Sequence, residues 1–457
     1  MDVLGKKNKK IVYFIASIAA IAGILFGFDT GVINGALVPL AKDLQITSIF
    51  TKEFIVACVP LGALFGAIIS PIFANYLGRK YSILLSATIF LPATLCVSLA
   101  QNVGFVELGR LGMGIAIGLS ATIVPMYLSE VSPTNIRGSL VFLFQLAVTI
   151  GLVLAFVINH AFDENWRAMF LVGVIPSGLL AIGILLLPQS PRWLYFKNKK
   201  QRALSVIRKL NHDKEVNHVF MSLGETVEQK VIPIGKIIIN PKLRKLLYLA
   251  VGLFIAQQFT GINTIFYYSE TIFYKAKLAI FESNVALSAT IICGIVNVIA
   301  TIFALRFIET FGRRTLLIYG MIGQIFCLFV CGITLEASST VNDIIALGAV
   351  LGFIFFFAIS LGGLPYVIMA ELFPLGARDK SMAITSCANW SFNFIVSVSF
   401  LTLINLLGLG YTFWLYALLT IISLIIFIYV MPETKNMPLE KIENNVFRGK
   451  PLRNIGA

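Results

Sequence analysis

Long apolar segments recur along the whole 457-residue chain, and this recurrence limits its fold more than any other feature. Each segment is close to the roughly 20 residues that an α-helix needs to cross a bilayer. Only helices and closed barrels satisfy their backbone hydrogen bonds in lipid, and no segment alternates polar and apolar residues as a barrel strand does. The segments lie at about 11–40, 53–75, 81–100, 105–130, 138–160, 167–188, 245–275, 284–308, 314–336, 343–371, 380–407 and 411–431. We therefore predict an all-α membrane protein of about twelve transmembrane helices.

The charge of the chain supports the same class. Charged residues make up 13% of the sequence, about half of what soluble domains carry. On a soluble protein, a net charge of +14 would suggest nucleic acid as the partner. In this chain the placement of the basic residues along the sequence is more informative than their number. The Lys6–Lys10 cluster, most of the polar stretch 189–243 and the tail all fall on one side of the predicted membrane. Because basic loops stay in the cytoplasm, both termini are predicted to be cytoplasmic, with lipid and not nucleic acid as the surroundings.

The two halves of the chain repeat each other. Gly78-Arg79-Lys80 returns as Gly312-Arg313-Arg314, and the pair Glu130 and Arg137 returns as Glu371 and Arg378, each about 240 residues later. Such parallel repeats are related by an axis along the membrane normal and place a binding site between them near the midplane. We expect one six-helix bundle over 1–188, a cytoplasmic linker with short helices over 189–243, and a second bundle with a cytoplasmic tail over 244–457.

One acid stands out. Asp29 is the only charge in the apolar run 11–40, and a carboxylate near the bilayer centre costs about 2.5–3.5 kcal/mol to insert. Arg110 is the only basic residue deep in the fourth segment, and the helical rise places both residues in the outer half of the bilayer. An adjacent arginine makes a carboxyl group release its proton more readily, whereas burial without such a partner makes it retain the proton. A changing separation would load and release a proton, and a static ion pair is the alternative. Glu107 could compete for Arg110, but we interpret it as a surface acid at the membrane interface.

Side-chain amides gather in the apolar segments. Gln257, Gln258 and Asn263 surround Gly261, which permits a break in the seventh segment, and further amides occur at Gln145, Asn297, Asn389 and Asn393. An amide both donates and accepts hydrogen bonds, which suits a neutral ligand rich in hydroxyl groups. Hydrogen bonding between packed helices is the alternative for any single amide.

The short motifs of this chain, and the order in which they occur, resemble those of the sugar porters of the major facilitator superfamily. They resemble most closely the bacterial galactose–proton and arabinose–proton symporters. The resemblance covers essentially the whole chain. It rests on Gly27-Phe28-Asp29-Thr30-Gly31, Pro125-Met126-Tyr127-Leu128-Ser129-Glu130, Ser190-Pro191-Arg192-Trp193, Gln257-Gln258-Phe259-Thr260-Gly261-Ile262-Asn263 and Pro432-Glu433-Thr434-Lys435.

The resemblance implies the major facilitator fold, a functional monomer in the bacterial inner membrane, and no cofactor besides the coupling proton. It assigns proton coupling to Asp29 and Arg110. It implies a sugar site formed by Phe26, Gln145, Gln257, Gln258, Asn263, Asn297, Tyr366, Asn389 and Trp390. Charged residues at the helix ends are placed to form a cytoplasmic gate: Arg79, Glu130, Arg137, Arg192, Glu309, Arg313, Glu371 and Arg378. The alternative for the basic residues is that they only set the topology.

Some positions depart from the family pattern. Asn75 and Gln189 stand where acids are usual, so we predict a weaker cytoplasmic gate. Tyr366 replaces a tryptophan of many relatives and Leu152 a glutamine of some, which leaves the preferred sugar open among galactose, glucose, xylose and arabinose.

The predicted function is proton-coupled symport of such a monosaccharide into the cell by alternating access. An uncoupled facilitator is the alternative, although it has no need of Asp29, and a transporter-like sugar sensor is a third reading. An enzyme is not expected, because the three histidines lie outside the membrane core, and no metal-ligand spacing occurs.

Overall fold

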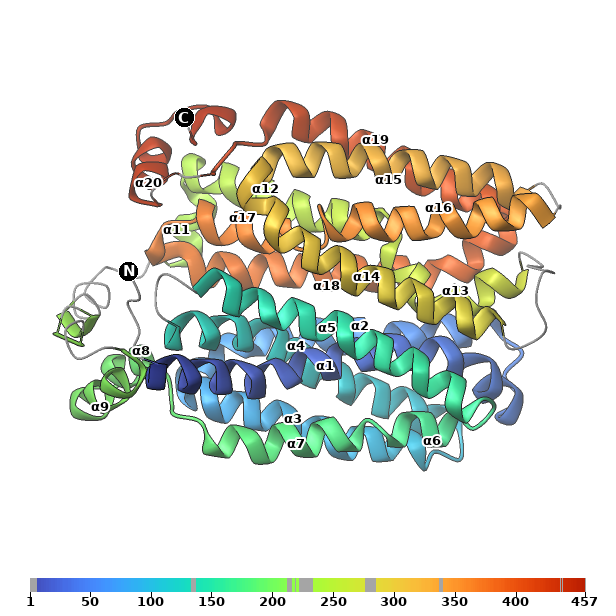
Figure 1. The fold of residues 1–457 in the computed structure, drawn as a ribbon, viewed down its shortest axis with the longest axis horizontal. Coiled ribbons are helices and arrows are strands. Elements are labelled where there is room, and N and C mark those ends of the chain that lie inside the picture. The colour runs from blue at the N-terminus through green and yellow to red at the C-terminus, as the bar shows by residue number, and fades with distance from the viewer. Residues whose placement is uncertain are drawn as a thin grey trace.

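The computed structural model describes residues 6–132, 137–211, 216–217, 219–221, 233–275, 285–336, 340–435, 437 and 439–456. Its secondary structure within these ranges is helical (Figure 1). In the described part of the chain, eleven helical stretches are long and apolar enough to span a membrane, and the shorter apolar helix Ile344–Ala358 completes the predicted twelve.

The first bundle contains α1 (Lys6–Asp43), α2 (Ile49–Tyr76), α3 (Gly78–Ser98), α4 (Val103–Val131), α5 (Arg137–Phe162) and a sixth span divided into α6 (Trp166–Leu171) and α7 (Val174–Leu186). The second contains α12 (Pro241–Phe259) with α13 (Ile262–Lys275), α14 (Val285–Phe311), α15 (Arg313–Glu336), α16 (Thr340–Ala358) with α17 (Leu364–Leu372), α18 (Leu375–Leu407) and α19 (Leu409–Val430).

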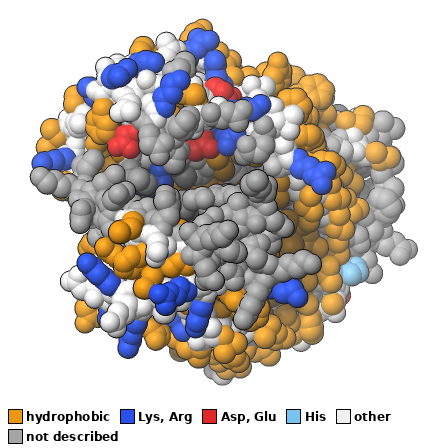
Figure 2. All heavy atoms as spheres, turned by 60° about the vertical axis from the view of Figure 1, so that its left-hand side comes forward, with side chains coloured by type: hydrophobic (Ala, Val, Ile, Leu, Met, Phe, Trp, Pro, Cys, Tyr) orange, Lys and Arg blue, Asp and Glu red, His pale blue; other side chains and the backbone are white. Residues whose placement is uncertain are grey.

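The long helices run along the long axis of the molecule, with the first bundle below and the second above in Figure 1. The connecting helices α8 (Pro191–Phe196), α9 (Lys200–Leu210) and α11 (Ile234–Ile239), the tail helix α20 (Leu439–Phe447) and both chain ends gather at one end, which we call the terminal end. We call the opposite end, where α1 finishes and α2 begins, the distal end. Figure 2 shows lysine and arginine side chains spread over the terminal end.

Small residues bring α1 against α5. A Cβ atom on Gly27 would lie 1.8 Å from the carbonyl oxygen of Val148, and one on Gly31 would lie 2.7 Å from the Cβ of Ala155. Such close approach through glycines spaced four residues apart is common between membrane helices. At about 100° per residue, Asp29 then lies on the face of α1 opposite to α5.

Two spans of the second bundle are broken. As predicted, the seventh span breaks at Gly261, whose φ of +78° suits only glycine. The tenth span, predicted at about 343–371, is interrupted between Ala358 and Leu364. The sequence Gly362-Gly363 favours this break, and Pro365, in the first turn of α17, has no N–H with which to continue the hydrogen bonds of α16.

Candidate substrate and proton-coupling site

A cavity of about 90 Å³ lies between the two bundles. All nine residues of the predicted sugar site line it: Phe26, Gln145, Gln257, Gln258, Asn263, Asn297, Tyr366, Asn389 and Trp390. Phe26 of the first bundle faces Trp390 of the second, with ring centroids 5.4 Å apart. The sequence therefore identified a set of residues that the fold brings together, although their part in binding remains a proposal.

The amides on the second-bundle wall bond to one another. The amide nitrogen of Asn263 donates to Oε1 of Gln258 at 2.6 Å, and Nε2 of Gln258 donates to Oδ1 of Asn389 at 2.6 Å. The side chains of Gln145 and Asn297 make no hydrogen bond to another described residue. The cavity thus presents a bonded row of amides beside two amides that have free hydrogen-bonding capacity within the described structure.

Gln257 connects this row to the broken tenth span. Its Nε2 donates to the carbonyl oxygen of Leu361 at 2.7 Å. In a continuous helix that oxygen would accept from residue 365, but Pro365 has no N–H to give. The proline therefore frees a carbonyl group that Gln257 then satisfies.

The predicted sugar site leaves out several other polar residues that line the cavity, although Asn393 was among the amides noted in the apolar segments. Thr149, Thr301 and Asn393 each follow a predicted residue by four positions, after Gln145, Asn297 and Asn389 respectively. Residues four apart share one face of a helix, so this spacing was the signal that would have found them. Leu152 also lines the cavity and keeps part of the first-bundle wall apolar.

The two predicted proton-coupling residues, Asp29 of α1 and Arg110 of α4, form an ion pair. Nη1 of Arg110 lies 2.8 Å from Oδ1 of Asp29, and both side chains are completely buried. The second carboxylate oxygen, Oδ2, is buried with no hydrogen-bond donor among the described residues. Glu107 makes no hydrogen bond or ion pair with a described residue, so it does not compete for Arg110 in this structure.

A proline also positions Arg110. Its Nε donates to the carbonyl oxygen of Ile55 at 3.1 Å and its Nη2 to that of Val56 at 3.4 Å. Pro60, four residues after Val56, cannot donate to the Val56 oxygen. The guanidinium group is thus fixed by the backbone of α2 while one nitrogen faces Asp29.

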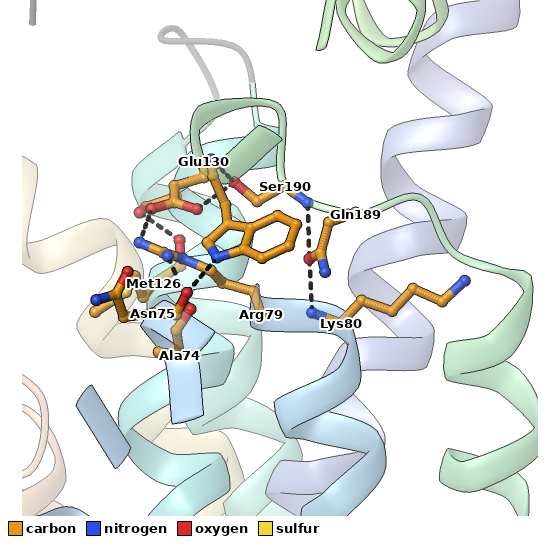
Figure 3. A network of polar contacts seen from close by, with 10 residues as sticks. Ala74, Asn75, Arg79, Lys80, Met126, Glu130, Gln189 and Ser190 are labelled. Atoms are coloured by element: carbon orange, nitrogen blue, oxygen red, sulfur yellow. Dashed lines mark hydrogen bonds and ion pairs between the residues drawn. The ribbon is translucent and has the colours of Figure 1, made fainter. Parts of the chain in front are cut away.

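A polar network ties helix ends together at the terminal end of the first bundle (Figure 3). Nη2 of Arg79 lies 2.8 Å from Oε1 of Glu130, and the Ser190 hydroxyl donates to Oε2 of the same carboxylate. Gln189 accepts from the backbone N–H of Lys80 at 3.0 Å and donates to the Leu77 carbonyl at 3.2 Å.

The second bundle repeats this network. Nη2 of Arg313 lies 2.9 Å from Oε1 of Glu371, and Thr434 donates to Oε2 at 2.5 Å. Glu433 accepts from the backbone N–H groups of Arg313 and Arg314 at 3.0 and 3.1 Å, the role that Gln189 fills in the first bundle. Gln189 therefore keeps a matching backbone hydrogen bond while it lacks the charge.

The other predicted gate residues are Arg137, Arg192, Glu309 and Arg378. Nη2 of Arg378 donates to the Phe373 carbonyl at 3.3 Å, whereas Arg192 is half-buried and pairs with no described residue. The side chains of Arg137 and Glu309 lie outside the described residues. The Arg79–Glu130 and Arg313–Glu371 ion pairs each stay within one bundle.

Comparison with known proteins agrees with this geometry. The chain is 36% identical over 458 aligned residues to the galactose-proton symporter of Escherichia coli K12, covering 99% of this chain and 98% of the relative. It is 34% identical to the arabinose-proton symporter of the same strain, covering 99% and 97%. The structure of the E. coli proton:xylose symporter XylE superimposes with a TM-score of 0.82 at 27% identity, covering 96% of this chain and 99% of that one.

The family model described as "Sugar (and other) transporter" matches residues 15–446. This match spans nearly the whole chain and both bundles. The protein therefore belongs to the sugar transporter family and has the fold of the major facilitator superfamily.

Proposed function

We propose that this protein carries a monosaccharide into the bacterial cell together with a proton, by alternating access across the inner membrane. The observation that carries the proposal is the position of α1. This helix contributes Phe26 and Thr30 to the amide-lined cavity and Asp29 to the buried pair with Arg110. The two relatives named above are proton symporters of galactose and arabinose, which supports the same chemistry here.

The cavity suits a sugar because its polar groups are neutral and both donate and accept. A hydroxyl group can replace one amide of the row from Asn263 through Gln258 to Asn389, and Gln145 and Asn297 offer further hydrogen bonds. At about 90 Å³ the cavity is smaller than the roughly 300 Å³ of typical ligand pockets, so binding requires its walls to separate. Movement of the bundles is therefore part of sugar binding.

The proton resides on Asp29, and Oδ2 is the atom that would hold it, because Oδ1 already faces Arg110. Residues 26 and 30 lie on the cavity face of α1, and Asp29 lies between them in sequence. A displacement of α1 on sugar binding changes the separation of Asp29 from Arg110 at the same time. An ion pair favours the charged carboxylate, whereas separation in a dry interior favours the protonated one.

The energy of such coupling is substantial. One charge moving through 100 mV is worth about 2.3 kcal/mol. Since each tenfold ratio corresponds to about 1.4 kcal/mol, one proton per sugar supports roughly fifty-fold accumulation before any pH difference is counted.

We place the terminal end in the cytoplasm because basic residues concentrate there (Figure 2). In that orientation Arg79 with Glu130 and Arg313 with Glu371 form the cytoplasmic gate region, together with Arg137, Arg192, Glu309 and Arg378. The gate pairs fix the helix ends within each bundle, so that each bundle moves as one body. The protein acts as a monomer without a cofactor.

Substitution Asp29→Asn tests the proposal. We expect counterflow of labelled sugar in proteoliposomes to persist, while accumulation driven by a proton gradient and sugar-induced alkalinisation of a weakly buffered cell suspension are both lost. The matched control is Glu107→Gln, which neutralises an acid in α4 that does not pair with Arg110 and should retain accumulation. Undiminished accumulation in Asp29→Asn would remove Asp29 from the coupling mechanism. Wild-type protein that exchanges sugar without moving protons would favour the uncoupled facilitator.

A further inference from the structure

A second buried acid does not belong to the cavity lining. Glu53 occupies the first turns of α2 at the distal end and is completely buried. Oε1 of its carboxylate accepts the backbone N–H of Thr402 at 2.7 Å, and Oε2 accepts the Thr402 hydroxyl at 2.8 Å. Both carboxylate oxygens are therefore bonded to a single residue.

The two partners belong to different bundles. Glu53 lies in α2 of the first bundle and Thr402 near the end of α18 in the second, 349 positions apart. These two helices pack against each other along the interface between the bundles. By contrast, the ion pairs of Asp29, Glu130 and Glu371 each stay within one bundle. The Glu53 hydrogen bonds thus exist only while the distal ends of the bundles are together.

The backbone contact adds to the specificity. Thr402 lies inside α18, where an N–H ordinarily donates to the carbonyl four residues earlier. Glu53 accepts a hydrogen bond from this N–H and another from the hydroxyl of the same residue, an arrangement that requires the carboxylate to sit at one position and orientation. A small sliding or opening movement between α2 and α18 breaks both bonds.

We propose that Glu53 is the latch of the distal gate: its carboxylate, bound to Thr402, holds the carrier closed on the side opposite the terminal end and sets the fraction of molecules that open there. The proposal rests on the alternating-access function proposed above. When the bundles part, Thr402 loses the carboxylate and Glu53 is exposed to water. The latch is a positioning device, because neither residue lines the sugar cavity.

The test measures the distal opening directly. Spin labels are attached to cysteines introduced at Phe50 and Leu406, which are exposed at the distal ends of α2 and α18, in a background whose six native cysteines are replaced. Distances between the labels are recorded in lipid nanodiscs, without sugar and without a proton gradient. A short distance reports the closed distal gate and a long distance the open one.

Thr402→Val keeps the shape of the side chain and the backbone N–H but removes the hydroxyl. We expect the ratio of open to closed molecules to rise about tenfold, equivalent to about 1.4 kcal/mol. Thr402→Ser, which keeps the hydroxyl, should leave the ratio unchanged, and Glu53→Ala, which removes both bonds, should raise it further. The sugar concentration that half-saturates uptake from the distal side should fall in the same order, because more molecules are ready to bind.

An unchanged distance distribution in Thr402→Val would overturn the latch, as would an equal increase in Thr402→Val and Thr402→Ser. If Glu53→Ala does not fold, the two Thr402 variants still decide the question. The distances need neither sugar nor protons, so a failed latch leaves the proposed symport standing. Loss of symport in the Asp29→Asn experiment does not affect this test.

Discussion

The contact between α1 and α5 supplies a prediction whose size follows from the structure. In Gly27→Ala the new Cβ would lie 1.8 Å from the Val148 carbonyl oxygen, whereas ordinary contact begins at 3.4 Å. The two helices must then separate locally by about 1.6 Å, the difference between these distances. Overpacking of this kind typically costs about 1–3 kcal/mol. The displacement also pushes α1 toward α4, where Nη1 of Arg110 and Oδ1 of Asp29 are already 2.8 Å apart. These two side chains cannot come closer, so the shift of α1 must distort the ion pair.

We therefore expect Gly27→Ala to lower the thermal midpoint of the detergent-solubilised protein by several degrees and to reduce sugar accumulation in vesicles at least tenfold. Gly178→Ala in α7 is the matched control, because nothing lies within 4 Å of its new Cβ. The control should match the wild type in both measurements or be slightly more stable, since alanine favours a helix over glycine by about 1 kcal/mol. A Gly27→Ala protein with wild-type stability and accumulation would refute the reasoning.

Three further substitutions test other parts of the structure. Pro60→Ala restores an N–H that competes with Arg110 for the Val56 oxygen; accumulation should fall severalfold while counterflow persists, and Pro92→Ala in α3 should change neither. Gln258→Leu breaks the amide row in two places, so equilibrium binding of labelled sugar should weaken at least tenfold, whereas Gln324→Leu, away from the cavity, should leave binding unchanged. Asn75→Asp, alone or with Gln189→Glu, restores negative charge at the terminal end. Labelling of cysteines introduced along the pathway at that end should become slower. Unchanged labelling would show that the acids do not strengthen the gate.

Two carbonyl groups that are freed by prolines serve different sites in the same way. Pro60 leaves the Val56 oxygen for Arg110, and Pro365 leaves the Leu361 oxygen for Gln257. Inside a membrane no water is present to donate a hydrogen bond to an unsatisfied carbonyl group. A polar side chain that donates to this group is therefore held in a fixed position. The proton-coupling pair and the amide row are each anchored by such a contact.

Much of this protein could be read from its sequence. Apolar length fixed the number of spans, and Asp29 and Arg110 stood out because charges in lipid are costly enough to require a partner. Gly261 marked a break because its neighbours are polar and glycine tolerates positive φ. The resemblance to sugar porters selected nine residues that the structure places around one cavity, although it did not point to Thr149, Thr301 or Asn393 as members of that lining.

Tertiary structure decided what depends on the distance between helices. No local pattern in the chain shows which carbonyls Arg110 and Gln257 reach, or that Glu53 joins Thr402 across the bundles. Hydropathy and helical period describe one segment at a time, and they say which face of a helix is apolar. Which oxygen a buried side chain reaches is set by how two helices far apart in sequence pack, and that is determined only when all of them have assembled.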